Sequence, residues 1–287
     1  MSDKPVVVVT GCSQGGIGFN LCQQFAAKGC RVFATARRVN AMDGLEAFGC
    51  EKVSLDVTDE VSIEKAVAEI YEKAGHVDIL VNNAGAHAIG AMLDTDMASA
   101  RHCLEVNVFG TLAMCKAVGR RMAERGSGKI VNIGSVVGYV STPWAGIYCL
   151  SKAAIHSMTD TLRMELKPFG VHVMIVAPGS IKSNFGDAAI ATISLPIDSL
   201  YKQYKAVING RANASQGPRA TPTEVFAKQV VQTVLKSSPP RYFTFGHLTP
   251  LFLIFFYLPR WITDRLLSAI MVKAVKAPES EAGKKNE

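Results

Sequence analysis

The chain has 287 residues, of which 48% are hydrophobic and 19% are charged, so it can bury a large core and is not disordered. This length predicts one α/β domain with an appendage. The net charge of +7 is compatible with an anionic cofactor, an anionic substrate or an anionic membrane surface. Because no basic run with interleaved aromatic residues occurs, we expect no nucleic-acid partner.

Cysteine and histidine spacing argues against a metal site. The seven cysteines are irregularly spaced without a Cys-x-x-Cys pair, and no histidine pairs with them at ligand spacing. We therefore expect no metal, no disulfide framework and a reducing compartment. The chain enters a strand directly after Pro5, so we expect no secretory signal peptide.

Strands and helices alternate along most of the chain. The expected strands are apolar, often β-branched runs at 6–10, 31–36, 52–55, 77–82, 129–134, 171–177 and 241–245. The expected helices have apolar side chains at helical spacing and cover 18–28, 61–74, 98–123, 147–166 and 223–236. This alternation predicts an α/β fold, a Rossmann-type doubly wound parallel sheet with helices on both faces.

The chain divides into a main domain and a tail. We expect residues 1–246 to form the Rossmann domain, with a substrate lid at 184–219 where the pattern weakens. Residues 247–276 are expected to form a hydrophobic and amphipathic helical tail, and 277–287 to be disordered. Four basic residues of the lid either meet a substrate phosphate or form a solvated face: Lys202, Lys205, Arg211 and Arg219.

A glycine cluster follows the first strand and reads Thr10-Gly11-Cys12-Ser13-Gln14-Gly15-Gly16-Ile17-Gly18. Its place between a strand and a helix is the context that a dinucleotide-binding motif requires. Gly11 makes the turn, Gly16 lets the backbone approach a pyrophosphate, and Gly18 lets the helix pack on the sheet. The N–H groups and the dipole at the start of the helix favour the phosphates.

The end of the second strand favours NADPH over NADH. It has no acid that would hold the ribose 2′-hydroxyl of NADH, whereas Arg37 is placed to bind a 2′-phosphate. Arg38 either shares that task or faces solvent. Asp56, after the third strand, either hydrogen-bonds the adenine amine or caps a helix with Thr58. After the fourth strand, short side chains let the backbone approach the adenosine ribose at Asn83, Ala84 and Gly85.

Tyr148 and Lys152 are four residues apart in an expected helix and project from one face. The ammonium of Lys152 is expected to lower the pKa of the Tyr148 phenol, so that Tyr148 can exchange a proton with a substrate carbonyl. Ser135 follows the fifth strand and is placed to hold that carbonyl oxygen. Asn107 interrupts an apolar helix face and is expected to hold a water that links Lys152 to solvent.

The span from Val6 to about Phe245 resembles the short-chain dehydrogenase/reductase family. Thr-Gly…Gly-Ile-Gly, Asn-Asn-Ala-Gly, Asn107, Ser135, Tyr148, Lys152 and Pro178-Gly179 appear in the family's order. The resemblance implies a nicotinamide cofactor and a catalytic tetrad of Asn107, Ser135, Tyr148 and Lys152. It implies that Ile181 and Ser183 contact the carboxamide, although the family usually has Thr where Ser183 stands. Together, motif and resemblance predict cofactor contacts from Gly11, Ser13, Gly16, Ile17, Gly18, Arg37, Asp56, Asn83, Ala84, Gly85, Tyr148, Lys152, Pro178, Gly179, Ile181 and Ser183.

The glycine motif departs from the usual family form because four residues, not three, separate Gly11 from Gly16. This form, the Ala-x-Ala-Arg-Arg strand end and the hydrophobic tail resemble the fungal and plant NADPH-dependent 1-acyldihydroxyacetone-phosphate reductases. The resemblance implies NADPH-dependent reduction of a lipid-like ketone to 1-acylglycerol 3-phosphate. Two alternatives are a hydroxysteroid or retinoid oxidoreductase and a nonenzymatic NADPH-binding membrane protein, although a pure binder has no need of Tyr148.

The hydrophobic run of the tail is too short to span a bilayer. Residues 248–258 cover about 16 Å as a helix, against roughly 30 Å of hydrocarbon. Apolar residues at helical spacing follow Trp261, which predicts a monotopic anchor on a membrane or lipid-droplet surface. The alternative is a helix docked on the core or in a homodimer interface. We accordingly expect the protein to be located on the endoplasmic reticulum membrane or on a lipid droplet, with its catalytic domain facing the cytosol.

Overall fold

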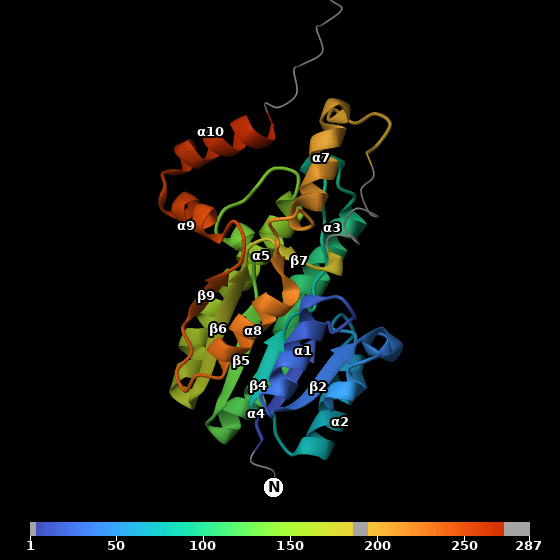
Figure 1. Cartoon of the computed structure of the whole chain (residues 1–287), viewed down its shortest axis with the longest axis vertical. Helices are drawn as coiled ribbons and strands as arrows, with labels where there is room; N and C mark the ends of the chain where they lie inside the picture. The colour runs from blue at the N-terminus through green and yellow to red at the C-terminus, as the bar shows by residue number, and fades with distance from the viewer. Residues whose placement is uncertain (1–3, 186–194, 273–287) are drawn as a thin grey trace, which may run out of the picture.

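The computed structural model describes residues 4–185 and 195–272 (Figure 1). Seven parallel strands form one sheet in the order β3-β2-β1-β4-β5-β6-β9, which confirms the predicted doubly wound fold. The strands are β1 (Val6–Thr10), β2 (Arg31–Ala36), β3 (Glu51–Ser54), β4 (Ile79–Asn82), β5 (Gly128–Ile133), β6 (Val171–Pro178) and β9 (Tyr242–Phe245). A separate parallel pair joins β7 (Ile181–Lys182) to β8 (Thr221–Pro222).

Helices cover both faces of the sheet because each central strand is apolar on both sides. On β1, Val7 and Val9 pack in the layer that contains α1 (Ile17–Ala27) and α8 (Thr223–Val234). Val6 and Val8 point to the opposite layer, which contains α2 (Glu60–Ala74) and α4 (Gly110–Arg125). The helix α5 (Gly146–Leu166) follows β5 and carries much of the candidate site.

One expected helix is interrupted. In place of a regular helix over 98–123, the chain forms α3 (Met97–Leu104), a π-helical turn η4 (Glu105–Phe109) and then α4. The turn leads directly into α4, and it contains the fully buried Asn107. Apolar spacing could not reveal this insertion, because a π-turn shifts the periodicity by one residue only.

The expected lid and tail meet at the end of the molecule opposite the N-terminus (Figure 1). The lid contributes α7 (Lys205–Ala212), and the tail forms α9 (Thr249–Tyr257) and α10 (Arg260–Met271). Parts of the predicted lid and the predicted disordered end lie outside the described residues. Within those residues, each helix is too short or too polar to cross a bilayer.

One face of the tail is docked on the domain. Phe252, Phe255 and Leu267 are buried in a cluster whose other members follow β5 or lie on α5: Val136, Val137, Val140, Ala145 and Cys149. The Trp144 indole N–H donates to the carbonyl of Met271 at 2.9 Å, which ties the end of α10 to the loop before α5. The opposite face of the tail stays exposed and apolar, so docking uses only part of its hydrophobic surface.

Candidate active site

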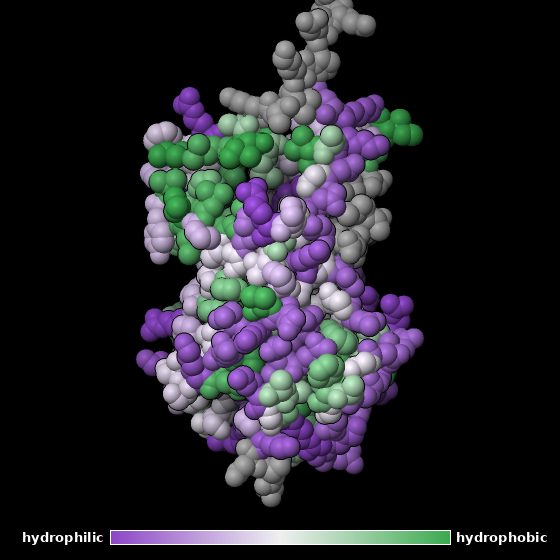
Figure 2. All heavy atoms as spheres, in the orientation of Figure 1, coloured by the Kyte–Doolittle hydropathy of each residue, from purple (hydrophilic) through white to green (hydrophobic). Residues whose placement is uncertain are grey.

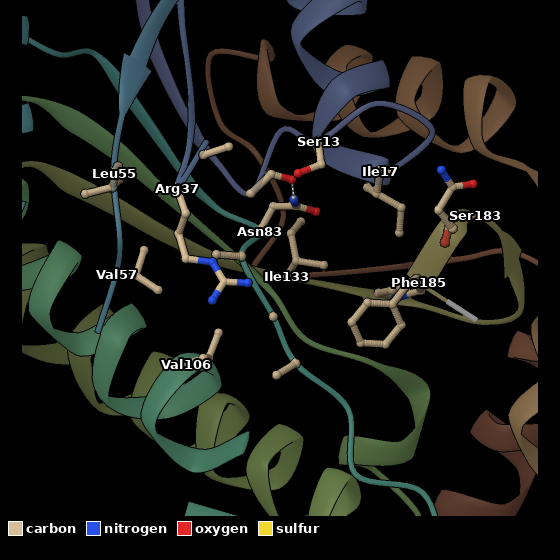
Figure 3. A pocket seen from close by; sticks show the side chains of 18 of the residues that line it. Ser13, Ile17, Arg37, Leu55, Val57, Asn83, Val106, Ile133, Ser183 and Phe185 are labelled. Atoms are coloured by element: carbon tan, nitrogen blue, oxygen red, sulfur yellow. Dashed lines mark hydrogen bonds between the residues drawn. The ribbon is translucent and has the colours of Figure 1, made fainter. Parts of the chain in front are cut away.

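A cavity of about 490 Å³ opens at the carboxyl ends of the central strands (Figure 3). Most of the residues predicted to contact a cofactor line it: Gly11, Ser13, Gly16, Ile17, Arg37, Asp56, Asn83, Ala84, Gly85, Tyr148, Lys152, Pro178 and Ser183. Three others lie outside this lining. Gly18 packs α1 against the sheet, Gly179 faces the backbone of His247, and Ile181 is buried in the core, so their contacts with a cofactor stay predictions.

The glycine-rich turn has the shape of a phosphate cradle. Gly11 has φ of +71°, and a Cβ there would lie 2.7 Å from the Ala84 Cα. A Cβ on Gly18 would lie 2.5 Å from the Gly11 carbonyl oxygen, so both positions require glycine. No side chain caps the N-terminus of α1 at Gly16. The first N–H groups of α1 therefore remain available for a pyrophosphate, and the turn fits a dinucleotide.

Arg37 extends into the cavity from the end of β2, far from Phe185 and Ser183 on the other side of the pocket (Figure 3). Its neighbour Asp56 accepts hydrogen bonds from the backbone N–H of Thr58 at 3.0 Å and from its hydroxyl at 2.8 Å. Although partial burial acts in the opposite direction, these bonds and the charge of Arg37 lower the pKa of Asp56. Asp59, and not Asp56, caps the following helix α2, so Asp56 forms a turn with Thr58 in place of a helix cap and also lines the cavity.

The helix α5 brings Tyr148 and Lys152 to one side of the cavity. The Lys152 ammonium lies 5.6 Å from the centre of the Tyr148 ring and donates to the carbonyl of Ile133 at 2.9 Å. Burial lowers the pKa of Lys152 to about 8. This lysine is therefore held by the end of β5 and can change its charge near neutral pH.

Burial raises the pKa of Tyr148, contrary to the expectation that Lys152 would lower it. The groups that act in the lowering direction are the guanidinium of Arg211 and a hydrogen bond with Ser135. The phenol is thus protonated at neutral pH. Such a group is suited to donate a proton, which is the direction that a carbonyl reduction requires.

Ser135 and Asn107 are both buried next to this pair. The backbone N–H of Ser135 donates to His156 Nε2 at 3.4 Å, and its hydroxyl accepts from the Val137 N–H at 3.3 Å. The Asn107 amide accepts from the N–H of Ala86 at 2.7 Å and donates to its carbonyl at 2.8 Å. Its side chain thereby fixes the loop that follows the Asn-Asn-Ala-Gly segment. The expected water link to Lys152 stays a prediction.

Three further residues shape the surroundings of Tyr148: the sequence patterns did not single out Phe185 or His87, and they left Arg211 open between a substrate phosphate and a solvated face. The ring of Phe185 lies 5.9 Å from that of Tyr148 and 4.9 Å from that of His87. Burial lowers the pKa of His87, so this ring is neutral. Arg211 is the third, and one signal for it was present: it follows Val207 and Ile208 by four and three residues, which places a cation on the apolar face of α7.

Known proteins resemble this arrangement along the whole domain. The family model described as short chain dehydrogenase matches residues 5–193. The chain belongs to the short-chain dehydrogenase family. The short-chain dehydrogenase ptmH of Penicillium ochrochloron is 39% identical over 237 residues, which are 81% of this chain and 85% of that protein. The NADPH-dependent 1-acyldihydroxyacetone phosphate reductase of Saccharomyces cerevisiae is 33% identical over 276 residues, 92% of this chain and 90% of that protein.

Solved structures agree with the family assignment. A short-chain dehydrogenase from Streptomyces avermitilis superposes with a TM-score of 0.78 at 29% identity and covers 94% of this chain and 97% of its own. A serine dehydrogenase complexed with NADP⁺ gives a TM-score of 0.74 at 25% identity, over 85% of this chain and 95% of its own. The short-chain dehydrogenase fold therefore extends over nearly the full described chain.

For this short-chain dehydrogenase we expect kcat/KM of ketone reduction to be level at neutral pH and to fall as the pH rises through about 8, where Lys152 loses its proton. Tyr148 does not cause this fall, because its pKa is raised. The measurement is a pH profile of the wild type and of Lys152→Arg, whose guanidinium stays charged. If the residual activity of the variant declines at the same pH as the wild type, another group titrates there.

Proposed function

We propose that this oxidoreductase uses NADPH to reduce a ketone of a lipid-like substrate, with 1-acyldihydroxyacetone phosphate as the preferred candidate. One observation carries the proposal. Cys149, the residue after Tyr148, is buried in the same cluster as Phe252 and Phe255 of the apolar tail. The proton donor therefore lies next to the cluster on which the tail docks, and the outer face of that tail is exposed and apolar, which suits a substrate that combines a polar ketone with an acyl chain.

Each residue has a defined task in this reaction. The cofactor, when bound, supplies the hydride, and the glycine-rich turn and Arg37 are the residues that would hold its phosphates. Ser135 donates a hydrogen bond to the carbonyl oxygen, which orients the ketone and polarises it. Tyr148 then transfers its phenolic proton to that oxygen, and Lys152 stabilises the phenolate that remains.

The S. cerevisiae relative, an NADPH-dependent 1-acyldihydroxyacetone phosphate reductase, supports both the cofactor and the substrate. Arg37 at the end of β2 supports NADPH independently, since a guanidinium binds a 2′-phosphate and offers nothing specific to a free 2′-hydroxyl. The test is NADPH consumption by the purified protein against panels of acyl-ketone phosphates, steroids and retinal. Turnover confined to steroids or retinal would replace the proposed substrate, and no turnover with any ketone would refute the proposed reaction.

We further propose that the exposed face of α9 and α10 binds a lipid surface, on the endoplasmic reticulum or a lipid droplet, with the catalytic domain facing the cytosol. Figure 2 shows hydrophobic residues gathered over these two helices. The exposed large side chains on them are Leu251, Ile254, Phe256, Tyr257, Trp261, Leu266 and Ile270. Exposed Arg260 and Arg265 lie among them and favour anionic headgroups. A bilayer is the occupant that matches apolar side chains bordered by arginines.

Charges on this face are expected to abolish membrane binding. Ile254 and Ile270 are 58% and 64% exposed, so Glu at both positions should leave the fold intact. Burial of each large apolar side chain contributes roughly 1.5–3 kcal/mol, so we expect liposome affinity to fall more than tenfold. The measurement is flotation with anionic liposomes, and NADPH binding should stay unchanged. Met164→Glu, at a 69% exposed position on α5, is the matched control. Equal flotation of both variants would contradict the proposal.

A further inference from the structure

The lid helix α7 is held firmly against the catalytic side of the domain. Ile208 is fully buried in a cluster with Trp144 and Ala91. The Trp144 ring also lies 5.2 Å from the ring of Tyr204 and 5.7 Å from that of Tyr201. Arg211 follows Ile208 by three residues, so it lies on the same face of the helix and points into the domain. The position of its guanidinium is thus set by packing.

Among the described residues, the guanidinium of Arg211 has one hydrogen-bond partner, and that bond is long. Its Nη2 donates to the buried Thr142 hydroxyl over 3.4 Å. Across residues 4–185 and 195–272, no carboxylate lies within ion-pair distance of it. Burial lowers the pKa of Arg211, which marks a partly desolvated charge. A cation in this setting is stabilised strongly by an anion that enters the site.

This charge lies next to the proton donor. The Thr142 hydroxyl that accepts from Arg211 is 3.8 Å from the Cys149 sulfur, and Cys149 follows Tyr148 on α5. Arg211 is also the cation that acts most strongly on the Tyr148 hydroxyl. An anionic group bound by Arg211 would consequently lie on the same side of the site as a carbonyl that Tyr148 protonates.

We propose that Arg211 is the residue that selects the substrate, by binding a phosphate ester one carbon away from the ketone. The inference rests on the proposed ketone reduction and adds the residue and the substrate class: α-phosphooxy ketones rather than neutral ketones. A guanidinium matches a phosphate through two parallel hydrogen bonds, and the path from Arg211 through Thr142 to Cys149 places this cation on the side of α5 next to Tyr148, which favours a phosphate close to the carbonyl. Lys202, Lys205 and Arg219 are not needed for this contact.

The test compares binding of 1-acylglycerol 3-phosphate and 1-acylglycerol, with the same short acyl chain, to the NADP⁺-loaded protein by calorimetry. The wild type should prefer the phosphate. Arg211→Met should weaken phosphate binding at least ~30-fold and leave 1-acylglycerol binding unchanged, because truncating one side of a buried charged pair has effects of this size. Arg211→Lys should be intermediate, since it keeps the charge without the two parallel bonds. Arg219→Met, at an exposed lid position, is the control and should match the wild type.

Kinetics separate this inference from the proposed reaction. In ketone reduction, Arg211→Met should raise KM for the phosphorylated ketone more than it lowers kcat. Equal losses for both ligands would assign Arg211 a structural role and overturn the inference, as would an unchanged phosphate affinity. If phosphate selectivity depends on Arg211 but no ketone is reduced, the proposed reaction fails and the anion site stands. If neutral ketones are reduced with the same efficiency as phosphorylated ones, the proposed reaction is supported and the inferred selectivity for phosphate esters is wrong. Unchanged NADPH binding verifies that each variant is folded.

Discussion

Replacing Tyr148 with Phe is expected to lower the rate of ketone reduction by roughly 10²–10⁴-fold, the usual contribution of a positioned general acid. The variant loses one hydroxyl from a ring that is held between Phe185 and Lys152, so the shape of the cavity is retained. NADPH binding should therefore change little. The measurement is steady-state turnover at saturating NADPH, together with an NADPH titration followed by fluorescence.

Tyr139→Phe is the matched control for this variant. The Tyr139 hydroxyl lies 3.1 Å from the Thr244 hydroxyl and outside the lining of the cavity, so its removal should leave turnover near the wild-type value. If the Tyr148→Phe variant still reduces the ketone at a substantial rate, Tyr148 is not the proton donor. A parallel loss of NADPH binding would show that the hydroxyl serves the cofactor rather than the ketone.

Replacing Arg37 with Asp is expected to shift the preference from NADPH toward NADH by at least ~10²-fold in the ratio of kcat/KM. Each charge-assisted hydrogen bond to a 2′-phosphate contributes ~1.5–3 kcal/mol, and every ~1.4 kcal/mol is tenfold. The new carboxylate repels the phosphate and accepts a hydrogen bond from a 2′-hydroxyl. Arg37 is exposed at the end of β2, so the exchange should not disturb the core.

Arg38→Asp, at the adjacent exposed position, distinguishes a specific contact from a general effect of charge. Arg37 lines the cavity and Arg38 is absent from its lining, so the control should alter the cofactor ratio far less. Both variants are compared by initial rates with NADPH and NADH on one ketone. If the ratio stays the same in Arg37→Asp, that residue does not read the 2′-phosphate. Equal shifts in both variants would show that the preference for NADPH comes from the combined positive charge of Arg37 and Arg38 and not from a specific contact of Arg37.

The sheet and the cofactor side of the site were predictable because their determinants are local in the sequence. Apolar runs such as Val6–Val9 identify strands buried on both faces, and a parallel sheet brings their carboxyl ends to one edge. Gly11 and Gly18 stand where a side chain would collide with neighbouring backbone. Each of these features depends on one strand end or one turn, so a pattern of residue types records it.

The substrate side of the site is harder to predict from the sequence because it depends on contacts between distant segments. The sequence places Arg211 in the lid but does not predict which way its side chain points. The packing of Ile208 on Trp144 fixes that direction. Trp144 has φ of +66°, which is an unfavourable backbone conformation for a bulky residue. No sequence pattern predicts this conformation. The charge balance at Tyr148 also differs from the expected one, because burial outweighs any nearby cation.

The two tryptophans of the chain lie in opposite surroundings. Trp144 is 8% exposed and donates its indole N–H to Met271, whereas Trp261 is 68% exposed on α10. The molecule therefore carries two intrinsic optical probes with separate roles. If the tail binds lipid, the emission of Trp261 would report that contact, whereas the emission of Trp144 would report whether α7 and the tail stay packed on the loop before α5. With Trp261→Phe, the remaining emission would follow this packing around Trp144 without a contribution from Trp261.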